Sequence, residues 1–129
     1  MNKESENFDT PLPGVIVSEI EAAKLIIRLL LRFRKTDPAK VSSNIPTACV
    51  LDGMLDDQVL TRRKFKERLK VYVFVEGAGI VFVATPQEII NYLSARQPWE
   101  DYDICLFDEN MEWCIGLTHN GQVIVAGSL

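Results

Sequence analysis

The 129-residue sequence contains only three cysteines, and every long apolar stretch in it is interrupted by charge. The cysteines are Cys49, Cys105 and Cys114. This sparse, odd number excludes a disulfide framework and suits a reducing compartment. The most apolar stretch, residues 22–33, carries three basic side chains at helical spacing and is too short to span a bilayer. The polar, acidic first residues do not resemble a signal peptide. We therefore expect a cytoplasmic protein with no membrane segment.

The sequence also has little of what common catalytic and metal sites require. Its single histidine, His119, is expected to flank a turn, and one histidine with scattered cysteines falls short of the three or four convergent ligands of a zinc site. The aspartates at positions 52, 56 and 57 match no calcium-loop spacing and suit capping and turn roles. Residues 77–79 lack the helix and the further glycine of a phosphate-binding loop. We therefore predict no catalytic residue, no metal and no cofactor.

The composition is that of an ordinary globular domain. Hydrophobic residues make up 47% of the chain and charged residues 25%, well away from disordered composition. A chain of this length fits one domain. Residues 1–13 are predicted to form a flexible N-terminal tail, and residues 14–129 a single α+β domain.

Three segments are predicted to be helical. Ser18 and Glu21 have capping-box spacing, and apolar residues then recur every three or four positions to about Lys35. A second helix is predicted from Asp56 or Asp57 through Leu69. A third begins at Thr85-Pro86-Gln87-Glu88, which has a threonine cap, proline at the first position and glutamate at the third, and runs to about Arg96.

The remaining regular segments are predicted strands. Residues 71–75 and 80–84 are β-branched or aromatic on both alternating faces, which is typical of a hairpin of central strands covered on both sides. Residues 102–108, 111–118 and 122–126 form two further hairpins. The order α-α-β-β-α-β-β-β predicts an antiparallel sheet of about five strands with two to three helices packed on one side.

The predicted turns determine which side chains share a face. A two-residue turn at Glu109-Asn110 would place Cys105 opposite Cys114, and Asn120-Gly121 is the preferred sequence for a second two-residue turn. The predicted core face holds Ile104, Leu106, Trp113 and Ile115. The predicted second face holds Cys105, Phe107, Cys114, Val123 and Val125. We interpret the facing cysteines as small hydrophobic residues, because no CxxC spacing or basic neighbour lowers a thiol pKa.

Charge is unevenly distributed along the chain, whose formal net charge is −4. Residues 61–70 carry six basic side chains and one acid, whereas residues 85–129 carry seven acids and one arginine. Nucleic acid is an unlikely partner because the isoelectric point is about 5.0. An acidic region favours a basic protein partner. On charge clustering alone, the candidate partner-binding residues are Asp101, Asp103, Asp108, Glu109 and Glu112.

The C-terminal hairpins carry a resemblance to known proteins. Asp103-Ile104-Cys105-Leu106-Phe107-Asp108 is followed by Trp113, Ile115 and Thr118-His119. This arrangement resembles the hairpins of small bacterial proteins, some of which are immunity proteins of polymorphic toxin systems. The resemblance implies a cytosolic protein that binds and blocks one toxin without catalysis. An acidic C-terminal region would suit a basic toxin such as a nuclease.

Three classes of function remain open from the sequence. The first is a non-enzymatic binding protein of the immunity or inhibitor type, which predicts an exposed acidic patch. The second is a self-associating structural or scaffold subunit that buries the second sheet face against a copy of itself or another chain, which predicts an oligomer. The third is an enzyme or small-ligand-binding domain, which predicts a deep cleft lined by several of His119, the cysteines and the acids.

Overall fold

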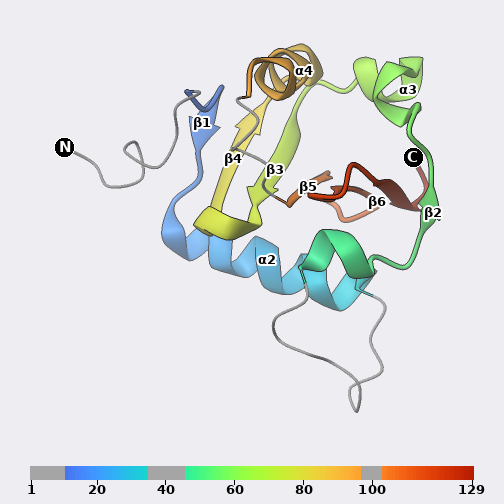
Figure 1. Ribbon diagram of the computed structural model, residues 1–129. Coiled ribbons are helices and arrows are strands. Elements are labelled where there is room, and N and C mark those ends of the chain that lie inside the picture. Colours follow the sequence, from blue (N-terminus) through green and yellow to red (C-terminus); the bar gives the residue numbers. More distant parts are fainter. Residues whose placement is uncertain (1–10, 35–45, 97–102) are drawn as a thin grey trace.

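The computed structural model describes residues 11–34, 46–96 and 103–129, which form one antiparallel sheet with helices (Figure 1). The seven strands lie in the order β1-β4-β3-β5-β6-β7-β2. Their bounds are β1 Val15–Ile16, β2 Met54–Leu55, β3 Val71–Val75, β4 Ile80–Ala84, β5 Ile104–Phe107, β6 Trp113–Leu117 and β7 Val123–Gly127. The helices are α2 Glu19–Phe33, α3 Arg63–Lys66 and α4 Pro86–Ala95, with 3₁₀ turns η1 Thr47–Val50, η2 Val59–Thr61 and η3 Glu76–Ala78. Most of the predicted tail, residues 1–10, lies outside the described residues.

The predicted α+β class with an antiparallel sheet is confirmed, but the predicted number of about five strands is too low. The two additional strands, β1 and β2, occupy the two edges of the sheet and contain two residues each. Two residues are too few to produce a recognisable alternation of apolar and polar side chains. Within the described residues, no helix is both long enough and apolar enough to cross a membrane.

The prediction that all helices pack on one side of the sheet is wrong, because helices cover both faces (Figure 1). On one face, Leu25, Leu29 and Phe33 of α2 join a buried cluster with residues of the sheet. On the other face, Phe65 of α3 and Ile89 of α4 belong to a second cluster. The central strand β3 is buried along its whole length as a result. This agrees with its apolar sequence on both faces, which predicted double cover.

The local signals at helix starts are confirmed, and the second predicted helix is wrong. The Ser18 hydroxyl accepts a hydrogen bond from the Glu21 amide at 3.4 Å, and Thr85 and Glu88 form a reciprocal capping box. Residues 56–69 contain only η2 and the four-residue α3, because the backbone of Arg62 between them is extended. Leu69, the last residue of the predicted helix, is 91% exposed.

The turn between β5 and β6 is longer than predicted. Phe107 pairs with Cys114, so Cys105 lies opposite Gly116 rather than opposite Cys114. The Asp108 carboxylate organises the loop by accepting hydrogen bonds from the amides of Glu112 at 2.8 Å and Trp113 at 3.1 Å. The register differs by two residues from the prediction, which leaves each side chain on its predicted face. The core face with buried Trp113 is therefore confirmed.

The turn between β6 and β7 is also longer than predicted, and here the difference changes the faces. Leu117 pairs with Val123 and the Thr118 amide donates to the Gln122 carbonyl, so the turn contains residues 119–121, of which only Gly121 has a positive φ. A shift of one residue moves every side chain of a strand to the other face. Val123 and Val125 therefore pack against the cluster of α3 and α4, and not beside Cys105 as predicted.

Candidate functional site

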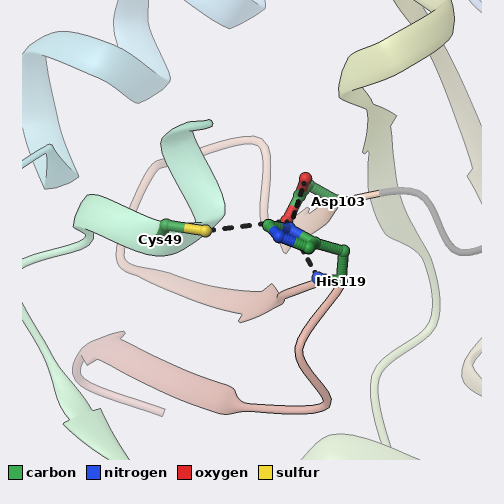
Figure 2. A group of neighbouring side chains, drawn as sticks. All are labelled: Cys49, Asp103 and His119. Atoms are coloured by element: carbon green, nitrogen blue, oxygen red, sulfur yellow. Dashed lines mark hydrogen bonds and ion pairs between the residues drawn. The ribbon is translucent and has the colours of Figure 1, made fainter. Parts of the chain in front are cut away.

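Three polar side chains from distant parts of the sequence meet at one end of the sheet (Figure 2). Cys49 lies on η1, Asp103 directly precedes β5, and His119 lies in the turn between β6 and β7. One ligand atom from each residue lies within 4.8 Å of the other two. We call these three residues the Cys-Asp-His cluster.

Asp103 is the centre of this cluster. Its Oδ1 accepts a hydrogen bond from the His119 amide at 3.0 Å and lies 3.0 Å from the His119 ring Nδ1. The second carboxylate oxygen lies 3.2 Å from the same Nδ1. The Cys49 thiol donates to Oδ1 across 3.6 Å. The carboxylate therefore contacts both the thiol and the imidazole (Figure 2).

Glu76 holds the segments that carry Cys49 and Asp103 beside each other. Its carboxylate accepts hydrogen bonds from the first amides of η1, Thr47 at 2.7 Å and Ala48 at 3.1 Å. Its own amide donates to the Asp103 carbonyl at 3.0 Å. A carboxylate stabilises a helical turn when it accepts from the first amides, which have no partner within the turn. The Glu76 side chain therefore fixes η1 against the start of β5.

Gly116 allows η1 to approach the sheet. A Cβ atom at this position would lie 2.7 Å from Cδ1 of Leu51 and 2.8 Å from the carbonyl oxygen of Ala48. Both distances are below those of ordinary van der Waals contact. The close packing of η1 on β6 therefore requires a residue without a side chain, and this packing positions Cys49.

The cluster is half-buried and open toward solvent at His119. The side chain of Asp103 is 15% exposed and that of His119 is 48% exposed. Burial raises the pKa of the Cys49 thiol, and the charge of Asp103 and its hydrogen bond raise it further. Such a thiol is protonated at neutral pH.

This geometry disfavours a cysteine–histidine catalytic pair. A catalytic base must lie within hydrogen-bonding reach of the proton that it removes. Here the thiol donates its proton to the Asp103 carboxylate, which also contacts the imidazole Nδ1. The arrangement instead brings together one sulfur, one nitrogen and one carboxylate oxygen, which are the three donor types that zinc takes in proteins.

The structure separates the acidic residues that charge clustering grouped together. Asp101 lies outside the described residues. Asp103 and Asp108 lie at opposite ends of β5, and five residues of extended chain separate them by about 16 Å. Glu109 lies 3.8 Å from Lys70 in an ion pair, and Glu112 is exposed. Asp103 and Asp108 also accept internal hydrogen bonds, so only part of the acidic run faces solvent with free oxygens.

Three of the six basic side chains of residues 62–70 form ion pairs with acids of the same chain. Arg62 pairs with Asp56, Arg63 with Glu67 and Lys70 with Glu109. The pair of Lys70 with Glu109 joins this basic run to the β5–β6 connection.

The outer face of α2 carries apolar side chains that contact solvent. Ile20, Ile27 and Leu31 are 71%, 57% and 83% exposed. Their spacings of seven and four residues put them on one stripe of the helix. This stripe lies opposite the face that packs on the sheet, so α2 is apolar on two sides.

Comparisons of the chain with protein-family models, with curated proteins and with solved structures found no match. The resemblance of the C-terminal hairpins to immunity proteins therefore remains a prediction. Two features of the described residues point to binding: the Cys-Asp-His cluster and the apolar outer stripe of α2.

Proposed function

We propose that this chain is a non-enzymatic protein-binding domain that associates through the outer stripe of α2, and that the partner there is a second copy of the chain. The observation that carries the proposal is the exposure of Ile20, Ile27 and Leu31 on a helix whose other face is already buried. Several large apolar side chains exposed on one stripe of a folded domain are typical of an interaction site.

The size of the stripe implies a weak, concentration-dependent dimer. Full burial of one aliphatic side chain contributes about 1.5–3 kcal/mol, so six partly exposed side chains would contribute about 6–12 kcal/mol. Association costs about 4–15 kcal/mol in lost freedom. The two terms nearly cancel, and α2 is only about 22 Å long, so the interface is smaller than that of stable complexes.

The charges on α2 favour an antiparallel second copy. Glu19 and Glu21 lie in the first turn and Arg32 in the last. Glu21 and Arg32 are eleven residues apart, about three turns, and therefore lie on the same flank of the helix. In an antiparallel pair, the same flank of the two copies meets, and Glu21 of each copy would face Arg32 of the other.

The interface proposed here differs from the one predicted for a self-associating subunit. Cys105 and Phe107 of the predicted bare sheet face are fully buried, because α2 covers them. An inhibitor that uses the acidic residues remains an alternative, but the ends of β5 divide those residues into separate groups.

Sedimentation velocity over a wide range of protein concentration tests the proposal. The full chain should change from monomer to dimer, and Ile27→Glu and Leu31→Glu should stay monomeric. Leu69→Glu is the matched control, because Leu69 is 91% exposed but does not lie on α2. A wild-type chain that stays monomeric throughout, or an equal loss in the Leu69 control, would refute the α2 interface. If the wild type and all three variants retained the same basic protein from lysate, the inhibitor alternative would be favoured.

Charge reversal tests the antiparallel arrangement separately. Glu21→Arg and Arg32→Glu should each weaken dimerisation, and the double variant should recover it. Helix content measured by circular dichroism controls for loss of the Lys24–Glu21 ion pair. A double variant as weak as the single ones would contradict the antiparallel pairing.

A further inference from the structure

A second feature, independent of the α2 stripe, supports a binding site of a different kind. The Cys-Asp-His cluster presents Sγ of Cys49, a carboxylate oxygen of Asp103 and Nδ1 of His119 toward one point (Figure 2). The three segments that carry these side chains are held by backbone hydrogen bonds and close packing, including those made by Glu76 and Gly116.

The separations between the donor atoms match those around a tetrahedral zinc ion. With zinc–ligand bonds of about 2.3 Å to sulfur and about 2.0–2.1 Å to nitrogen and oxygen, tetrahedral ligands lie about 3.5 Å apart for sulfur and oxygen, and about 3.3 Å apart for nitrogen and oxygen. In the cluster, Sγ lies 3.6 Å from Oδ1 and Nδ1 lies 3.0 Å from it. The third separation, between Sγ and a ring nitrogen of His119, is at most 4.8 Å. It needs to close by only about 1 Å to reach the tetrahedral value.

We propose that Cys49, Asp103 and His119 form a binding site for a divalent transition-metal ion, with zinc as the preferred ion. The ligand set balances charge, because a thiolate and a carboxylate together offset the two positive charges of the ion while the imidazole binds neutral. When the sulfur–zinc bond forms, the thiol proton leaves to solvent, and no electron is transferred. The ring binds through Nδ1, which already faces the carboxylate.

Three protein ligands leave a fourth position for water. His119 is half exposed, so this position opens to solvent rather than into the core. An ion held by three protein ligands and one water differs from a closed structural site, which has four protein ligands. Glu76 acts as a positioning residue, because its hydrogen bonds to η1 and to the Asp103 backbone hold two of the ligands together.

Cobalt substitution tests the site directly. The full chain is freed of metal with a chelator and titrated with Co²⁺, whose tetrahedral thiolate complexes have intense visible bands and a sulfur-to-metal charge-transfer band in the near ultraviolet. We expect both bands to appear, and zinc to abolish them by displacement. His119→Ala and Cys49→Ser should each weaken binding by at least about tenfold, given that even groups outside the ligand shell change affinity by 10–100-fold. Glu112→Gln, an exposed acid elsewhere, is the control and should bind as wild type does.

A labelling measurement on the wild-type chain keeps the test valid if a variant fails to fold. Cys105 and Cys114 are buried, so alkylation of the folded chain reports on Cys49. Zinc should slow this alkylation at least tenfold, and magnesium should not change it. Absence of the charge-transfer band, its persistence in His119→Ala, or equal labelling with and without zinc would overturn the proposal.

Discussion

Replacing Gly116 with alanine should destabilise the fold and loosen the Cys-Asp-His cluster together. The added Cβ would lie 2.8 Å from the Ala48 carbonyl oxygen and 3.1 Å from its Cα, both of which are backbone atoms of η1. Such overpacking costs about 1–3 kcal/mol. Removing a glycine from a strand recovers about 0.5–1 kcal/mol. The clash is the larger effect, so we expect a net loss of about 1–2 kcal/mol in the free energy of unfolding.

This loss corresponds to a decrease of about 4–7 °C in the melting temperature of a domain of this size. Because η1 must move away from β6, Cys49 should also be alkylated faster in the folded variant. Gly79→Ala is the matched control, since no atom lies within 4 Å of its added Cβ but its φ of +65° is strained for alanine. That control should lose stability without a change in labelling. Unchanged labelling in Gly116→Ala would refute the conclusion that Gly116 positions Cys49.

Three further predictions follow from burial and charge. Trp113→Ala should lower the free energy of unfolding by about 3–5 kcal/mol, because the ring is fully buried; a loss below about 1 kcal/mol in chemical denaturation would contradict this. Without metal, Cys49 should be alkylated slowly at neutral pH because its thiol pKa is raised, and Asp103→Asn should accelerate the reaction. The hydrogen bond from Arg62 lowers the pKa of Asp56 in the folded chain. The stability that this ion pair contributes is complete above the pKa of unfolded Asp56 and is lost as the pH falls through the lower folded value. The melting temperature of Arg62→Ala should therefore depend less on pH below about pH 4 than that of the wild type.

Local features of the fold could be predicted from the sequence because they depend on neighbouring residues. The caps at Ser18 and Thr85 involve side chains three residues from the amides that they bind. The strands β3 and β4 show their burial in an unbroken apolar sequence. Strands that are apolar on both faces must be covered on both faces of the sheet. This pattern therefore already conflicted with the prediction that all helices pack on one side.

Turn length was harder to predict, and its consequences depended on whether the difference was odd or even. The β5–β6 connection shifted the register by two residues, and the face of Trp113 was still predicted correctly. The β6–β7 turn shifted it by one residue, and the faces of Val123 and Val125 were predicted wrongly. Asn120-Gly121 suits a two-residue and a three-residue turn alike, because the three-residue turn also needs a positive φ at its glycine.

The Cys-Asp-His cluster could not be predicted from spacing. Cys49 and His119 are seventy residues apart, and no motif links them. They meet because β5 pairs with β6, which brings Asp103 beside the turn that carries His119, and because η1 packs on Gly116 of β6. The absence of convergent metal ligands was inferred from their separation in sequence, which says nothing about separation across a sheet.

The acidic run in the last third of the chain is better explained by backbone chemistry than by one surface patch. Asp103 and Asp108 accept hydrogen bonds from amides in turns, Glu88 does so at the start of α4, and Glu76 does so at the start of η1. Carboxylates are preferred at such positions because the amides there have no partner in the adjoining helix or strand. The number of acidic residues in a segment rich in short turns therefore exceeds the number of carboxylates that are free to contact a partner. For this reason the apolar stripe of α2, whose side chains have no such internal role, is the stronger candidate for a protein interface.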